Sequence, residues 1–87
     1  MEVSVWDTYV PRKDGKVMHF DILVPSTVTD ASTIFRFGKQ YLETKPFSTG
    51  ELSSNECRFC HIGHATEEMV TSIENEGFSI IEMENCQ

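Results

Sequence analysis

Two cysteines and two histidines lie within the nine-residue stretch ECRFCHIGH, residues 56–64. Thiolates and imidazoles are the ligands that zinc prefers in structural sites. Zn–S bonds of about 2.3 Å let both sulfurs of a C-x-x-C turn hold one ion. The sequence therefore predicts that Cys57 and Cys60 bind zinc or a similar soft divalent ion, in a structural rather than a catalytic site.

The remaining ligands of this zinc site follow less directly from the spacing. His64 lies four residues beyond Cys60 and can turn back toward the ion, so we expect it to be the third ligand. His61 directly follows Cys60, and in many backbone conformations its side chain points away from the two sulfurs. The fourth ligand stays open among Cys86, His61, His19 and water.

The same stretch allows other interpretations. The C-x-x-C-H order matches the attachment pattern of c-type haem, but that attachment normally requires export, and so small a domain has little room for a porphyrin. We therefore do not expect haem c. The two thiols also suit a thiol–disulfide redox pair, although the expected helix begins only after the cysteines. They equally suit reduced thiols that pack a loop, because free cysteine behaves as a small hydrophobic residue.

A second group of polar residues falls on two expected strands. Asp7, His19 and Asp21 alternate with apolar residues and share one face, where they resemble an acid–base set. Polar residues are also ordinary on the solvent side of a half-buried sheet. Because no nucleophile or phosphate-binding loop accompanies them, we expect a binding or interaction domain rather than a free-standing enzyme.

The hydrophobic pattern predicts the elements that hold these residues. Two strands over 2–10 and 16–24 flank an Asp14-Gly15 turn, as in a β-hairpin. Alternation in the second strand predicts a buried face. Its members are Met18, Phe20, Ile22 and Val24.

Two helices and two shorter strands follow the hairpin. A helix over 31–44 is capped by Asp30 or Thr29, and a second helix begins near Thr66 and stops at Gly77. A short strand is expected near Leu52 and a last strand over 78–83. The sequence thus predicts a single α+β domain over residues 1–87, a two-layer sandwich of order β-β-α-(β)-α-β with both helices on one face of the sheet.

Composition and charge limit the partners. The chain has 87 residues and a net charge of −7, which argues against nucleic acid because phosphate binding relies on Lys and Arg. No Lys or Arg follows Arg58, so the acidic C-terminal third favours a cation or a basic partner. No apolar run reaches the length of a membrane span, and the first ten residues lack the features of a signal peptide, so we expect a cytoplasmic protein with reduced thiols.

We also expect self-association, most simply as a homodimer. A small sheet commonly hides a free strand edge in a partner. Trp6, Phe47 and Phe59 offer further apolar surface. The basic hairpin tip of one subunit is able to contact the acidic C-terminal third of another. A further protein partner stays unidentified.

Three motifs together resemble a known family. They are VSVWDTYV at the start, VMHFDILV in the second strand and ECRFCH before an acidic helix, and the ending MENC completes the likeness. The chain resembles, over essentially its whole length, the bacterial family catalogued as domain of unknown function 2024. The resemblance implies a compact α/β domain and carries over no activity, substrate or cofactor.

Overall fold

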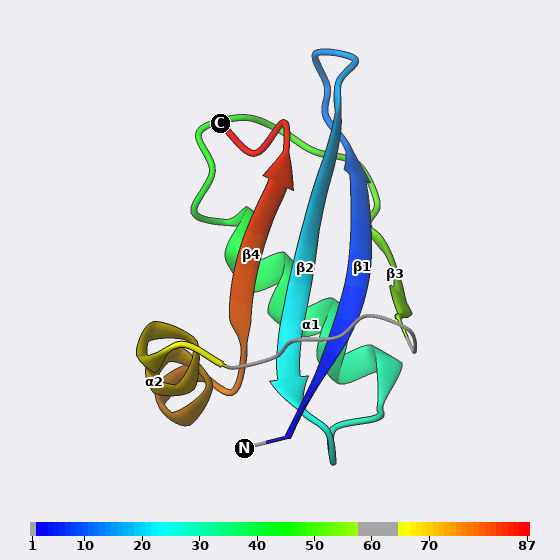
Figure 1. The fold of residues 1–87 in the computed structure, drawn as a ribbon. Helices are drawn as coiled ribbons and strands as arrows, with labels where there is room; N and C mark the ends of the chain where they lie inside the picture. The colour runs from blue at the N-terminus through cyan, green and yellow to red at the C-terminus, as the bar shows by residue number, and fades with distance from the viewer. Residues whose placement is uncertain (1, 58–64) are drawn as a thin grey trace.

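Four antiparallel strands form one sheet in the order β3-β1-β2-β4 (Figure 1). The computed structural model describes residues 2–57 and 65–87. The elements are β1 (Val3–Pro11), β2 (Val17–Pro25), α1 (Ala31–Leu42), β3 (Ser53–Glu56), α2 (Glu67–Glu76) and β4 (Ser79–Glu84). The predicted α+β class and the predicted order of elements are confirmed.

The β1–β2 hairpin turns at Asp14-Gly15, as expected. Gly15 has a φ of 94°, a conformation that a residue with a Cβ rarely adopts. The Asp14 carboxylate accepts a hydrogen bond from the Lys16 N–H at 3.2 Å, and the Arg12 N–H donates to the Lys16 carbonyl at 2.7 Å. These contacts fix the turn, and the turn fixes the register of β1 against β2.

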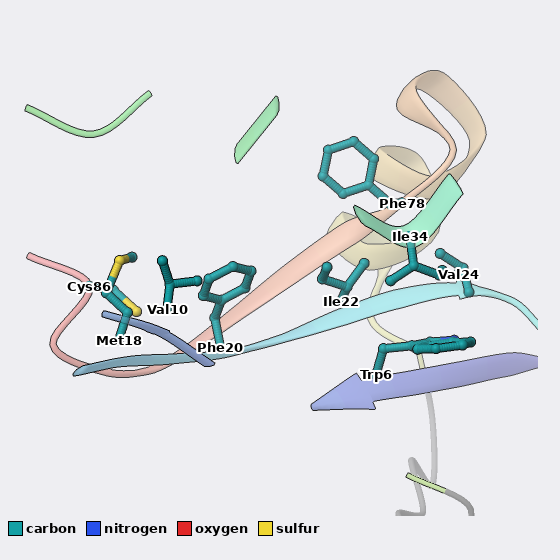
Figure 2. Packing of buried hydrophobic residues seen from close by; sticks show 9 residues of the cluster. All are labelled: Trp6, Val10, Met18, Phe20, Ile22, Val24, Ile34, Phe78 and Cys86. Atoms are coloured by element: carbon teal, nitrogen blue, oxygen red, sulfur yellow. The ribbon is translucent and has the colours of Figure 1, made fainter. Parts of the chain in front are cut away.

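One face of the sheet forms the main hydrophobic core beneath α1 (Figure 2). Ile34 of α1 is fully buried against this face. Gly38 allows the close approach, since a Cβ there would lie 3.0 Å from the Leu52 side chain and 3.4 Å from that of Ile22. The predicted buried face of β2 is confirmed, with every member fully buried: Met18, Phe20, Ile22 and Val24.

Both helices begin and end as the sequence predicts to within about two residues. Asp30 caps α1, where its carboxylate accepts from the Ser32 N–H at 3.3 Å. Thr66 caps α2, where its hydroxyl accepts from the Met69 N–H at 3.1 Å. Gly77 ends α2 in the left-handed conformation, with a φ of 92°.

The second helix is not placed as predicted. It lies beside the β4 edge of the sheet, whereas α1 lies across the sheet (Figure 1). Ile73 of α2 packs on Val5 and Leu23, which alternation directs to the face opposite α1. The expectation that both helices share one face is therefore wrong. The short connection through Gly77 keeps α2 next to β4, which is an edge strand.

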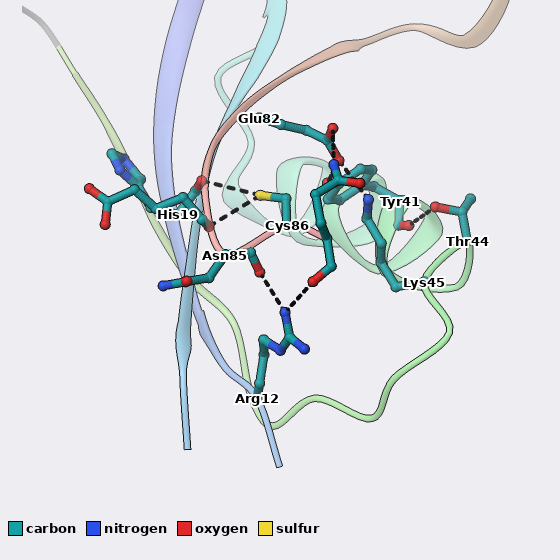
Figure 3. Close-up of polar contacts among 10 residues, drawn as sticks. Arg12, His19, Tyr41, Thr44, Lys45, Glu82, Asn85 and Cys86 are labelled. Atoms are coloured by element: carbon teal, nitrogen blue, oxygen red, sulfur yellow. Dashed lines mark hydrogen bonds and ion pairs between the residues drawn. The ribbon is translucent and has the colours of Figure 1, made fainter. Parts of the chain in front are cut away.

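A single arginine ties the hairpin to the C-terminal segment. The Arg12 guanidinium donates to the Asn85 carbonyl at 3.0 Å and to the Gln87 carbonyl at 2.7 Å (Figure 3). It also forms an ion pair with Asp14 and lies 3.7 Å above the centre of the Phe47 ring. Residues that are distant in sequence are thus held at one end of the sheet.

The core gives a first prediction, tested with two residues of β2 that point to opposite faces. Replacing the fully buried Ile22 with alanine leaves a cavity, and we expect a loss of about 2–5 kcal/mol in the free energy of unfolding. The control Val17→Ala, at a side chain 49% exposed, should cost less than about 1 kcal/mol. Urea unfolding measures both values, and equal losses would contradict this assignment of the two faces.

Candidate metal centre

Asp7, His19 and Asp21 meet on the face of the sheet opposite α1. Asp7 and Asp21 are direct cross-strand partners in the hairpin register, and His19 pairs with Tyr9, one step along the same face. Side chains of directly paired residues lie about 4.5–5.5 Å apart at Cβ. The register therefore brings together the polar set that the sequence indicated.

The ligand atoms of these three side chains converge on a small volume. One nitrogen or oxygen from each lies within 4.8 Å of the other two. His19 Nε2 lies 3.6 Å from Asp7 Oδ1 and 3.7 Å from Asp21 Oδ1, and both separations are too long for a hydrogen bond. His19 Nε2 and Asp21 Oδ1 are buried and accept or donate no hydrogen bond to any described residue. Leaving such atoms unsatisfied costs free energy, which a water molecule or a bound cation would relieve.

Tyr9 holds the imidazole in place from one side. The rings of Tyr9 and His19 stack with 4.3 Å between centroids and 7° between planes. Stacking restricts the orientation of the imidazole, and the side chain of Tyr9 stays 47% exposed. The hairpin register implies this pairing, but only the ring geometry reveals that Tyr9 supports the site.

The carboxyl group of Asp21 has an unusual proton affinity. Burial raises the pKa of Asp21 from 3.8 to about 6, and hydrogen bonding to Asp7 and the negative charge of Asp7 act in the same direction. The charge of His19 opposes this change. The negative charge of Asp7 thus favours the protonated form of Asp21, and a bound cation would relieve this repulsion.

The first residue of the predicted thiol site lies at the end of β3. The Cys57 N–H donates to the Val5 carbonyl at 2.8 Å, which extends the β1–β3 ladder by one hydrogen bond. Cys57 is disulfide-bonded. The other predicted ligands in this stretch, Cys60, His61 and His64, lie outside the described residues.

Cys86 is not brought beside Cys57. Its thiol is buried with Met18 in the core under α1 and donates to the His19 carbonyl at 3.4 Å (Figures 2 and 3). Met18 pairs with Val10 of β1. The Cys57 N–H contacts Val5, which lies five residues before Val10 in the same strand. At about 3.4 Å per residue, this separation is roughly 17 Å. Cys86 is therefore a core residue at the other end of the sheet.

These features define a small α+β protein with a four-stranded antiparallel sheet and a cluster of two carboxylates and an imidazole on one face. Residues 1–83 match the family model described as "Domain of unknown function (DUF2024)", and the chain belongs to this family. Neither helix of the described residues is long and apolar enough to cross a membrane.

One solved structure is similar over the full length of both chains. It is the NMR structure of protein NE1680 from Nitrosomonas europaea, a Northeast Structural Genomics Consortium target, with 34% sequence identity and a TM-score of 0.68. No match is found among curated proteins. The comparisons agree with the fold and with the family resemblance, and they assign no activity to the chain.

The raised pKa of Asp21 gives a second prediction, about the metal-free protein. Folded protein binds more protons than the unfolded chain between about pH 4 and pH 6, so the contribution of Asp21 to stability falls as pH rises through that window. Asp21→Asn removes this penalty, which is up to about 3 kcal/mol for such a shift. We expect the variant to gain stability over the natural protein on going from about pH 4 to pH 7.

Urea unfolding with a chelator present measures this difference, and Asp14→Asn serves as the control. Hydrogen bonding to the Lys16 backbone lowers the pKa of Asp14, so its contribution is lost as pH falls and its replacement should have the opposite sign. Parallel pH profiles for natural protein and Asp21→Asn would contradict the prediction.

Proposed function

We propose that the protein is a metal-binding domain that holds one zinc-class divalent ion through Asp7, His19 and Asp21. The observation that carries the proposal is the spacing of the three side chains. Ligands bound at about 2.0–2.1 Å to a tetrahedral ion lie roughly 3.3 Å apart. The separations of 3.6 and 3.7 Å from His19 Nε2 to the two carboxylates are within a few tenths of an ångström of that value.

The ligand types also fit zinc. One imidazole nitrogen and two carboxylate oxygens are accepted by Zn²⁺, and three protein ligands leave one position for water or a further ligand. Mn²⁺ and Fe²⁺ accept similar donors, so metal availability and geometry decide among these ions. The ligands come from two paired strands, which hold them with little conformational entropy left to lose.

Electrostatics favours the ion over a proton. Two carboxyl groups converge with one imidazole at this site, and a divalent cation balances the negative charge that they carry when ionised. Glu84, the β4 partner of His19, adds a further negative charge nearby. Metal binding requires ionised Asp21, so affinity should rise with pH as this carboxyl loses its proton.

A second proposal concerns the thiol segment and rests on its sequence. Cys57 and Cys60, with His64 and then His61, offer soft donors for a structural zinc ion. Oxidation of the same two thiols to a disulfide would instead serve the thiol–disulfide redox alternative, because an oxidised sulfur does not bind zinc. Measurements on the reduced and on the oxidised protein therefore distinguish zinc binding from thiol–disulfide redox activity.

The third prediction tests the sheet site alone. In a Cys57→Ser/Cys60→Ser background, calorimetric titration with Zn²⁺ should give one equivalent, with an affinity that increases between about pH 5 and pH 7. Asp7→Asn/Asp21→Asn should weaken binding at least about 100-fold, since two of three ligands lose their charge. The exposed hairpin residue provides a control, Asp14→Asn, which should leave binding unchanged. Unchanged affinity in the double variant would overturn the proposal.

The fourth prediction tests the thiol segment. Reduced protein purified without a histidine tag should carry a second equivalent of zinc that is lost in Cys57→Ser/Cys60→Ser and kept in Cys86→Ser, as elemental analysis measures. Reversible oxidation of the two thiols, with no zinc in the reduced protein, would instead support the redox function. If the reduced protein carried no second equivalent of zinc and the thiols did not oxidise reversibly, both the zinc-binding and the redox function would be excluded.

A further inference from the structure

A groove separates α1 from α2 at the β4 edge of the sheet. Its volume is about 970 Å³. Three apolar side chains lie on its floor, namely Met69 of α2, Phe78 just before β4 and Ile80 of β4, and the rest of its described lining is mostly polar. Tyr41 of α1 closes the opposite wall, and its hydroxyl donates to Glu82. We name this feature the interhelical groove.

Two exposed carboxylates stand on the α2 wall of the interhelical groove. Glu68 and Glu76 are eight residues apart, which is about 12 Å along a helix. Among residues 2–57 and 65–87, neither forms an ion pair, and none of the residues lining the groove is Lys, Arg or His. The described part of the groove therefore combines apolar residues on its floor with negative charge on its rim.

The charge on α2 is unfavourable for the helix itself at one end. Glu68 lies in the first turn, where a negative charge is stabilising. Glu76 is the last helical residue, where a negative charge opposes the helix dipole, and the last turn contains no basic residue. A cationic partner bound beside Glu76 would offset this unfavourable charge.

We propose that the interhelical groove docks a basic amphipathic segment of a partner protein. The apolar side of such a segment covers Met69, Phe78 and Ile80, while two cations pair with Glu68 and Glu76. Lys or Arg residues eight apart on a helix span the required distance of about 12 Å. Nucleic acids and anionic lipids are repelled by the same rim and by the net charge of −7. The interaction is weak to moderate and weakens as salt rises.

The experiment uses the full chain and a synthetic probe. The probe is a Lys/Leu peptide of about five helical turns with Leu on one face, and its matched control replaces every Lys with Glu. Amide NMR spectra should show shifts at Tyr41, Ser72 and Ile80 with the Lys/Leu peptide and none with the Glu/Leu peptide. Shifts confined to other parts of the chain would overturn the proposal.

Two charge variants separate docking from general attraction to an acidic protein. Glu68→Lys/Glu76→Lys removes the rim of the groove and should weaken peptide binding about three- to tenfold. Glu67→Lys/Glu74→Lys makes the same change of charge near the same two ends of α2, outside the groove, and should weaken binding less than about twofold. Thermal unfolding confirms that both variants fold.

Equal weakening in the two variants would mean that only the net charge matters, and the proposal would fall. Sedimentation of the protein without peptide tests the other occupant, a second copy of the chain. Self-association that Glu68→Lys/Glu76→Lys abolishes and Glu67→Lys/Glu74→Lys preserves would assign the groove to that copy and overturn docking of a separate partner. None of these results depends on metal bound at Asp7, His19 and Asp21.

Discussion

The register of the β1–β2 hairpin is the constraint on which the rest of the structure depends. It pairs Trp6 with Ile22 on the face under α1 and Asp7 with Asp21 on the opposite face. A slip of one residue would exchange the two faces of the moved strand and bury its polar residues. The Asp14-Gly15 turn and the hydrophobic core oppose that slip together, so the core and the candidate metal centre are specified by the same pairing.

This coupling explains how an unfavourable polar arrangement persists. Like charges directly opposite each other destabilise a strand pair, and Asp7 faces Asp21. The burial of Phe20 and Ile22 on the other face of β2 holds the register despite that repulsion. The buried Nε2 of His19, which has no hydrogen-bond partner in the described part of the chain, adds a second local cost. The proposed cation would relieve both costs.

The two proposed sites differ in the distance between their negatively charged groups. At the sheet site, two carboxylates and an imidazole converge within 4.8 Å and suit a single ion. In the interhelical groove, Glu68 and Glu76 are separated by about 12 Å over an apolar floor and suit an extended cationic chain. No Lys or Arg follows Arg58 in the sequence, so the charged residues of the C-terminal third other than histidine are all acidic.

Local sequence determined the elements and much of the sheet site. Alternation over Met18 to Val24, the Asp14-Gly15 turn and the caps at Asp30 and Thr66 predicted strands, hairpin and helices, because each signal acts between residues close in the chain. The same alternation placed Asp7, His19 and Asp21 on one face. Tertiary structure alone decided that α2 packs on Val5 and Leu23 and that Cys86 lies in the core far from Cys57. It also decided that His19 Nε2 has no hydrogen-bond partner among residues 2–57 and 65–87. These outcomes depend on how distant elements pack together, and periodicity along one strand or helix holds no information about that packing.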